Sequence, residues 1–274
     1  MEHGLIGIFD SGVGGLSVWR EITRLVPQAK ILYLADQIHV PYGSRSLEEV
    51  RRFAEGITRF LSDQGANPIV IASNTTSAAA LYHVRTLFPD VSFVGMEPAL
   101  KPAIQKTQTG VVGVIATQVT FQGELFANLM EKYASTIRVL PQACPGLVEA
   151  VEAGALDTPE TMEMLRTYLS PMLASGVDQL VLGCTHYPFL VPAIERVIGK
   201  DVSVIDPASS VAHQTVRKLK QQRLGTNVQE ARQVFYTSGD PAKFTRMIQR
   251  LLPTLAGKTL DVRTVHWQEN ELNA

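Results

Sequence analysis

Short apolar runs rich in β-branched residues alternate with helix-like stretches along this chain, and the alternation limits its possible folds more than any other feature. Four such runs lie at residues 5–9, 30–35, 69–72 and 92–95, and four more at 111–116, 137–140, 179–182 and 202–205. Helices are expected between them, at residues 15–26, 46–61, 76–87, 120–133 and 158–174. A tail from residue 208 adds helices and strands at 233–236 and 260–265. The alternation predicts an α/β fold with mainly parallel sheets.

Two polar segments follow strands that occupy matching places in the two series. Residues 72–77 (Ala-Ser-Asn-Thr-Thr-Ser) follow the third run, and residues 183–188 (Gly-Cys-Thr-His-Tyr-Pro) follow the seventh. Because open α/β sheets bind ligands at the carboxyl ends of their strands, we expect two similar α/β domains with the active site in the cleft between them. The expected division gives a first domain of residues 1–96 plus 208–274, with Asp10 and Ser73, and a second domain of residues 97–207, with Cys184.

Composition and charge narrow the class of protein. The chain has 274 residues, of which 45% are hydrophobic and 19% charged, so it can bury a full core. Its 25 basic and 26 acidic residues give a net charge of −1, which argues against a nucleic-acid partner. The most basic stretch, residues 218–223, is expected to be a solvated helix end. No apolar run is long enough to span a membrane and no signal peptide is recognised, so we expect a cytoplasmic protein.

Cysteine usage agrees with a reducing compartment and argues against a metal site. Cys144 and Cys184 are the only cysteines, and two free thiols are typical of a cytoplasmic protein of this size. The sequence has no CxxC or HExxH motif and no cluster of Cys and His at ligand spacing, so no structural or catalytic metal is expected.

A glycine-rich segment follows the first expected strand. Asp10 and Ser11 precede Gly12, Gly14 and Gly15, which predicts a loop that a ligand can approach closely. Free N–H groups at the next helix start would suit a carboxylate. The run lacks the last glycine of a dinucleotide fingerprint, so nucleotide binding is disfavoured. Asp10 can also serve only as a structural helix cap, and that alternative stays open.

Ser73 and Cys184 are the two candidate reactive side chains. Cys184 precedes an expected helix and stands two residues from His186, and both features favour a thiolate. Asn74, Thr75 and Thr185 can hydrogen-bond a carboxylate. The loop Pro41-Tyr42-Gly43-Ser44 can add a ring, backbone donors and a hydroxyl. Cys144 has no such companions and is interpreted as structural.

Together these motifs resemble the glutamate racemases, of the cofactor-independent aspartate/glutamate racemase superfamily. The similarity extends from about residue 5 to residue 220. It is carried by residues 9–18 (Phe-Asp-Ser-Gly-Val-Gly-Gly-Leu-Ser-Val), 33–36 (Tyr-Leu-Ala-Asp), 41–43 (Pro-Tyr-Gly), 74–75 (Asn-Thr), 115–117 (Ile-Ala-Thr) with Thr120, and 182–188 (Leu-Gly-Cys-Thr-His-Tyr-Pro). The resemblance implies two α/β domains around one active site, no pyridoxal phosphate or metal, and production of D-glutamate for peptidoglycan. We also expect a homodimer.

The resemblance implies a role for each matching residue. Cys184 would deprotonate L-glutamate and position 73 would serve the D-face, with Asp10 assisting position 73 and both Glu152 and His186 assisting Cys184. Two groups are needed because a single base would usually return the proton to the face it left. The substrate's carboxylates and ammonium group would be held by Asp10, Ser11, Pro41, Tyr42, Gly43, Asn74, Thr75, Thr117, Thr120, Thr185 and His186.

Position 73 departs from the family pattern, because it carries Ser where the first catalytic Cys is expected. A hydroxyl is a much weaker acid than a thiol, so racemisation is expected to be impaired, whether the change is engineered or a natural divergence. The departure leaves room for a decarboxylase-like relative that uses Cys184 alone, and for a non-catalytic amino-acid-binding protein. A serine hydrolase built from Ser73, His186 and Asp10 is a weaker alternative, because Ser73 lies in no GxSxG elbow.

Overall fold

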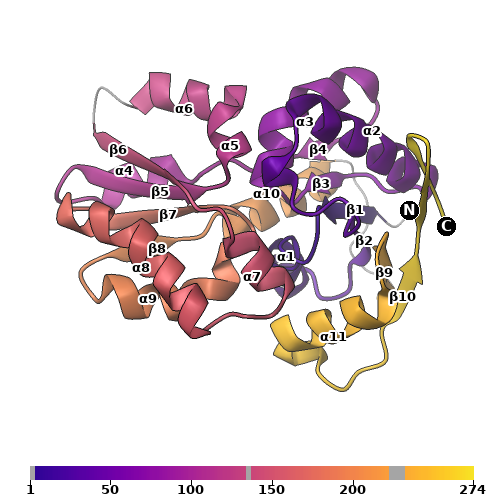
Figure 1. The fold of residues 1–274 in the computed structure, drawn as a ribbon. Helices are drawn as coiled ribbons and strands as arrows, with labels where there is room; N and C mark the ends of the chain where they lie inside the picture. The colour runs from indigo at the N-terminus through magenta and orange to yellow at the C-terminus, as the bar shows by residue number, and fades with distance from the viewer. Residues whose placement is uncertain (1–3, 134–136, 222–231) are drawn as a thin grey trace.

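Two parallel sheets, each with its own helices, lie side by side in the computed structural model (Figure 1). The structure describes residues 4–133, 137–221 and 232–274. The fold class expected from the sequence is confirmed, since every strand pair within the two main sheets is parallel.

The six-stranded sheet has the strand order β10-β9-β2-β1-β3-β4. Its strands are β1 (Leu5–Asp10), β2 (Lys30–Ala35), β3 (Ile69–Ile71), β4 (Phe93–Val94), β9 (Gln233–Thr237) and β10 (Asp261–Thr264). The helices of this half are α1 (Leu16–Leu25), η1 (Tyr42–Ser44), α2 (Leu47–Asp63), α3 (Asn74–Leu87), α10 (Ala208–Gln221), α11 (Pro241–Leu251) and η3 (Pro253–Leu255). Ser46 and Glu49 form a capping box at the start of α2.

The four-stranded sheet has the strand order β6-β5-β7-β8. Its strands are β5 (Val111–Ala116), β6 (Arg138–Ala143), β7 (Gln179–Gly183) and β8 (Ser203–Ile205). Its helices are α4 (Leu100–Lys106), α5 (Gln118–Gln122), α6 (Glu124–Tyr133), α7 (Leu147–Glu152), α8 (Pro159–Ala174), η2 (Tyr187–Leu190) and α9 (Val191–Ile198).

The two sheets repeat one topology. The order β2-β1-β3-β4 in the first sheet matches the order β6-β5-β7-β8 in the second. In both, the strand order reverses at the first strand of the series, β1 or β5, which is where α/β sheets bind ligands. Ser73 follows β3 and Cys184 follows β7, so both lie beside these reversal points.

The core is continuous between the two sheets. A single cluster of buried side chains includes Ile8 and Tyr33 from the first sheet and Ile115 and Leu182 from the second. The two halves are therefore packed together by apolar burial as well as by the polar contacts described below.

A small antiparallel hairpin ends the chain, formed by β11 (His266–Gln268) and β12 (Glu271–Asn273), and the sequence did not predict it. It lies against α2, where Trp267 and the backbone of Asn270 occupy the space that a side chain at Gly56 would need. Gly56 costs helix α2 about 1 kcal/mol relative to alanine, and the docked hairpin explains its presence there.

Three further expectations need correction. The helix expected at residues 120–133 is split into α5 and α6 at Gly123, which packs directly on Ala78 of α3. Helix α3 begins at Asn74, two residues early, because Ser73 caps it. Cys184 leads into the 3-10 helix η2 and not directly into an α-helix. The basic stretch at 218–223 ends α10, but its residues 222 and 223 lie outside the described residues.

None of the helices in the described parts of the chain combines the length and apolar character that a membrane crossing needs.

Candidate active site

A narrow cleft of about 260 Å³ lies where the strand ends of the two sheets face each other. Its lining comes from the β1 end, the η1 segment, the α3 start, the β5 end, α7 and the β7 end. The lining residues are Asp10, Ser11, Pro41, Tyr42, Gly43, Ser73, Asn74, Thr75, Thr117, Val148, Cys184, Thr185 and His186. Side chains that are far apart in the sequence thus meet at the predicted edge of the sheets.

Asp10 is buried at the end of β1, with 1% of its surface exposed. Its carboxylate accepts hydrogen bonds from the Ser11 amide (2.8 Å), the Gly15 amide (2.7 Å) and the Thr185 hydroxyl (3.1 Å). Burial raises the pKa of the Asp10 carboxyl above its ordinary value, although His186 and the bonds from Ser11 and Thr185 act in the opposite direction. The bond from Thr185 connects the two halves of the molecule.

The sequence suggested that the amides of the glycine loop are free to bind a ligand, but two of them are hydrogen-bonded within the protein. The Gly15 amide donates to Asp10, and the Val13 amide donates to Glu152 Oε1 at 2.7 Å. A Cβ atom at Gly12 would overlap Glu152, and one at Gly14 would overlap His186. The glycines therefore make room for side chains of the other half.

Ser73 occupies the N-cap of α3. Its hydroxyl oxygen accepts the Thr76 amide at 3.3 Å, and only 4% of the residue is exposed. The next residue, Asn74, is 2% exposed and lines the cleft, yet neither polar atom of its amide group has a hydrogen-bond partner in the described structure. Buried polar groups are nearly always paired, so the Asn74 amide is suited to receive a polar ligand.

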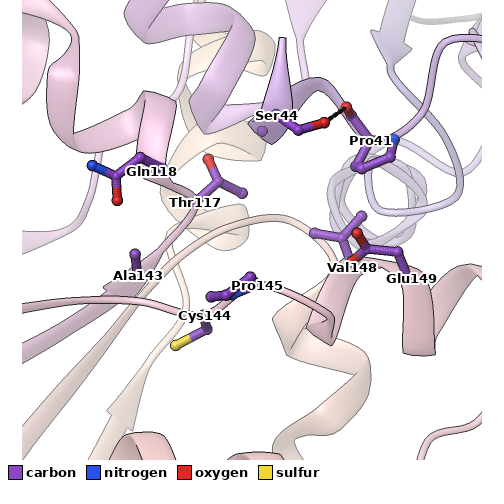
Figure 2. A pocket seen from close by; sticks show the side chains of 10 residues that line it. Pro41, Ser44, Thr117, Gln118, Ala143, Cys144, Pro145, Val148 and Glu149 are labelled. Atoms are coloured by element: carbon purple, nitrogen blue, oxygen red, sulfur yellow. Dashed lines mark hydrogen bonds between the residues drawn. The ribbon is translucent and has the colours of Figure 1, made fainter.

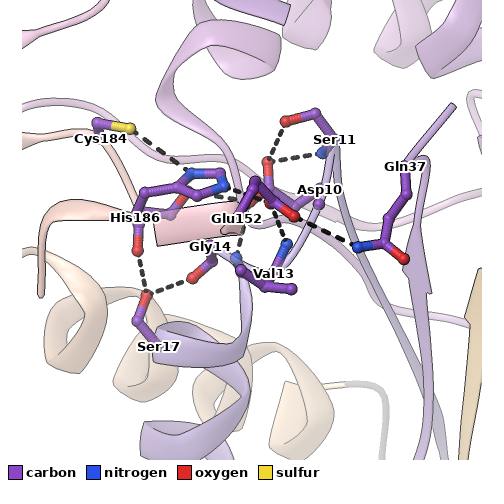
Figure 3. Close-up of polar contacts among 12 residues, drawn as sticks. Asp10, Ser11, Val13, Gly14, Ser17, Gln37, Glu152, Cys184 and His186 are labelled. Carbon is purple, nitrogen blue, oxygen red and sulfur yellow. Dashed lines mark hydrogen bonds and ion pairs between the residues drawn. The ribbon is translucent and has the colours of Figure 1, made fainter. Parts of the chain in front are cut away.

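His186 links Cys184 to Glu152 (Figure 3). The Cys184 Sγ lies 3.8 Å from His186 Nδ1, and His186 Nε2 lies 2.7 Å from Glu152 Oε1. Burial alone would lower the pKa of His186, but Cys184 and Glu152 raise it well above its ordinary value. Burial likewise opposes ionisation of Glu152, yet the bond with His186 and the Val13 amide hold the Glu152 pKa below its ordinary value. Both shifts favour an imidazolium paired with a carboxylate.

Three threonine hydroxyls join the halves at the opposite part of the cleft. Thr75 Oγ1 of α3 lies 2.8 Å from Thr117 Oγ1 and 3.3 Å from Thr120 Oγ1. Thr117 and Thr120 are themselves 3.0 Å apart. Each hydroxyl can donate one proton and accept others, so the group can reorient when a ligand carboxylate arrives.

The structure brings together all but two of the residues predicted for the site. Glu152 stands behind His186 and Thr120 behind Thr117, so neither lines the cleft. Val148, on α7, lines the cleft and was missed, since an apolar residue in a short helix carries no local signal of a site. Gln37 was missed too; it donates to Glu152 Oε2 at 3.3 Å.

A second pocket of about 540 Å³ adjoins the cleft (Figure 2). The two cavities share Pro41, Gly43, Thr117 and Val148, and the second is also lined by Cys144 and Glu149. Cys144 is 2% exposed, and burial raises the pKa of its thiol far above the ordinary value. That environment makes a poor nucleophile and agrees with the structural role predicted for Cys144.

Within residues 4–133, 137–221 and 232–274, no three His, Cys, Asp or Glu side chains are grouped so that they could hold a metal ion.

Comparison with known proteins places this arrangement in a family. The model of the Asp/Glu/Hydantoin racemase family matches residues 6–215. A glutamate racemase from Roseiflexus sp. (strain RS-1) is 47% identical over 248 residues, which cover 90% of this chain and 91% of the relative. The solved glutamate racemase isoform RacE1 from Bacillus anthracis has a TM-score of 0.85 at 31% identity, covering 99% of this chain and 100% of that one. The glutamate racemase from Francisella tularensis, solved in complex with D-glutamate, has a TM-score of 0.83 at 28% identity, covering 96% and 98%. The chain therefore belongs to the glutamate racemases of the Asp/Glu racemase family, which are isomerases.

Proposed function

We propose that this protein interconverts L- and D-glutamate by two-base proton transfer without a cofactor, and that Ser73 in place of the first catalytic thiol slows the reaction. The observation that carries the proposal is the placement of Ser73 and Cys184 after matching strands of two like sheets, both lining one cleft. Removal of a Cα proton and its return on the other face requires two groups, and two related halves supply one each. The product would be D-glutamate for peptidoglycan synthesis.

Cys184 would take the α-proton of L-glutamate. The His186 imidazolium beside it stabilises the thiolate, and Glu152 holds that imidazole in place through the 2.7 Å bond. On the other side, Asp10 would assist position 73. The unpartnered amide of Asn74, the hydroxyls of Thr75, Thr117 and Thr185, and the η1 segment would hold the substrate's charged groups.

Ser73 would limit the D-face transfer. The pKa of a serine hydroxyl is several units higher than that of a thiol. Ser73 is therefore almost never deprotonated at neutral pH and is a poor base. It still caps α3 and leaves the neighbouring polar groups in place, which supports near-normal glutamate binding.

Two further assignments accompany this proposal. We propose domains of residues 1–96 plus 208–274 and of residues 97–207; the division of the strands between the two sheets supports these limits.

We also propose a cytoplasmic homodimer. Tyr82 and Leu87 of α3, 49% and 47% exposed, border one surface hollow and are candidates for the contact. Sedimentation analysis across a range of protein concentrations tests the oligomeric state, and a monomer throughout would refute the dimer.

The proton-transfer proposal is tested by its half-reaction. In deuterated water, NMR should show exchange of the α-proton of L-glutamate running ahead of net racemisation, because Cys184 is intact and Ser73 is not an efficient partner. Cys184→Ala should abolish exchange, while the matched variant Cys144→Ala should retain it. Equal exchange in Cys184→Ala would show that the base is misassigned.

Calorimetry, together with the exchange measurement, tests the alternative of a non-catalytic protein. Heat of binding with glutamate but no α-proton exchange would favour an amino-acid-binding protein. A hydrolase that uses Ser73 is disfavoured, because His186 is bonded to Cys184 and Glu152 and the Ser73 hydroxyl accepts from the Thr76 amide.

A further inference from the structure

Asp36 is a fully buried carboxylate that the proposed proton transfer does not use. One of its oxygens, Oδ2, accepts from the Tyr42 hydroxyl at 2.6 Å and contacts His39 Nδ1 at 2.8 Å. The other, Oδ1, accepts from the Ser238 hydroxyl at 2.8 Å and from the Trp267 indole N–H at 2.7 Å. With partners on both oxygens, the carboxylate has a fixed orientation, and charge-assisted bonds of this length are strong.

The Asp36 carboxylate joins the C-terminal segment to the wall of the cleft. Tyr42 lines the cleft together with Pro41 and Gly43, and its hydroxyl is held by Asp36. The donors on the far oxygen come from the loop after β9 and from the hairpin strand β11. Both lie beyond residue 215, where the match to the family model ends.

A second contact follows the same route. The Thr237 hydroxyl donates to Gln37 Oε1 at 2.9 Å, and Gln37 Nε2 donates to Glu152 Oε2 at 3.3 Å. Ring packing reinforces the first contact, because the Trp267 ring lies against His39 and Phe53, with centroids 5.4 Å and 5.8 Å away. The C-terminal segment therefore contacts residues 36–42 through hydrogen bonds and ring packing.

We propose that Trp267 and Ser238 are positioning residues, which hold the Pro41–Gly43 wall in its binding position through the carboxylate of Asp36. The inference rests on the proposed function in taking glutamate as the ligand of that wall. Removal of one of the two donors to Oδ1 would leave the buried carboxylate with fewer hydrogen bonds and a less fixed orientation. The Tyr42 hydroxyl would follow it, and the wall would lose its fixed position.

The principal test is Trp267→Phe, which keeps a ring but removes the indole donor. We expect the dissociation constant for glutamate, measured by calorimetry, to rise about tenfold, the value of roughly one charged hydrogen bond. The rate of α-proton exchange at saturating glutamate should stay within about twofold of wild type, because the Cys184–His186–Glu152 contacts are untouched. Trp19→Phe is the matched control: Trp19 is buried, and its indole N–H has no partner in the described structure. It should lose stability but not affinity.

Ser238 provides an independent arm. Ser238→Ala removes the other donor to Oδ1 and should also weaken glutamate binding, whereas Ser238→Thr keeps the hydroxyl and should restore it. If affinity is unchanged in both Trp267→Phe and Ser238→Ala, or if Trp19→Phe weakens binding as much as Trp267→Phe does, the inference is wrong.

The backbone amide resonance of Gly43 reports on the wall without any ligand. It should move in Trp267→Phe and in Ser238→Ala, and stay in place in Trp19→Phe. A wild-type protein that binds no glutamate, but whose Gly43 resonance moves in these variants, would refute the proposed function and support the positioning role. A wild-type protein that binds glutamate, with a Gly43 resonance that does not move, would refute the positioning role alone.

Discussion

At the scale of single residues, position 73 has two possible roles that favour different side chains. As the N-cap of α3 its hydroxyl accepts the Thr76 amide, a task for which serine is among the best residues. The same position, at the positive end of a 14-residue helix, would stabilise a thiolate. Serine therefore favours the helix, while cysteine would favour proton transfer.

Ser73→Cys should raise racemisation by orders of magnitude in both directions and lower stability by about 1 kcal/mol. The activity gain follows from a drop of several pKa units, each corresponding to about 1.4 kcal/mol in the proton-transfer equilibrium. The stability cost follows from a weaker cap. Circular dichroism of both enantiomeric reactions and urea unfolding measure the two effects. A folded variant that binds glutamate and racemises no faster would remove position 73 from the chemistry.

Local sequence patterns located most of the site residues but not their partners. Asp10 ends a strand, Ser73 and Cys184 each follow one, and strand ends can be predicted from the sequence. Gln37 gains a role only through Glu152, which lies 115 positions away in the sequence. Trp267 gains one only through Asp36, which lies 231 positions away. Such contacts depend on how the halves and the tail pack, which no local pattern encodes.

At the scale of elements, the short helix α7 places Glu152 against the loops that follow β1 and β7, where it contacts Val13 and His186. The ion pair it forms with His186 is buried, with 12% and 3% of the side chains exposed. The pKa of Glu152 is lowered, so its contribution to stability is present above 4.5 and is lost as pH falls through the folded-state value. The pKa of His186 is raised, so its contribution is complete below 6.5 and is lost as pH rises through the folded-state value.

Glu152→Gln should therefore cost most stability between those two pH values. We expect a loss of about 3 kcal/mol near pH 5.5 and a smaller loss near pH 9.5, because removing one member of a buried pair leaves the other uncompensated only while it is charged. Urea unfolding at the two pH values measures this. Glu149→Gln, on the exposed face of the same helix, is the control and should change little at either pH. An equal cost for Glu152→Gln at both pH values would show that the pair is not ionised.

Elements with a strong local signal were predicted from the sequence, whereas α7 and the final hairpin were not. Buried runs such as β1, β2 and β5, and the capped helix α2, have local signals strong enough to fix their type. The hairpin strands lack the apolar run that marks a short strand such as β3, and helix α7 has only six residues, too few to show a period. These short elements acquire their structure from the surfaces against which they pack.

At the scale of the whole molecule, the cleft exists because two like sheets meet through their loops. Val13, Asp10 and Thr75 of one half bond to Glu152, Thr185 and Thr117 of the other. Ser17 adds a bond from its hydroxyl to the Thr185 carbonyl at 3.1 Å. The similarity of the two halves could be predicted from the sequence. The closeness of their contact could not, since it depends on Gly12 and Gly14, where any side chain would overlap Glu152 or His186 of the other half.

Gly14→Ala tests whether that closeness is needed for chemistry. A Cβ atom at Gly14 would overlap the His186 ring and come within 2.7 Å of Asp10 Oδ2, so the ring must move away from the cleft or the halves must separate. Moving the ring would disturb its contact with Cys184, and separating the halves would carry Cys184 and His186 together away from Asp10, so we expect α-proton exchange of L-glutamate to fall at least about tenfold. Gly176→Ala is the matched control: Gly176 has a positive φ and open space around it, so alanine there costs about 1 kcal/mol of stability without touching the cleft. Exchange that survives in Gly14→Ala, at a stability no lower than that of Gly176→Ala, would show that His186 does not need its present place beside Cys184.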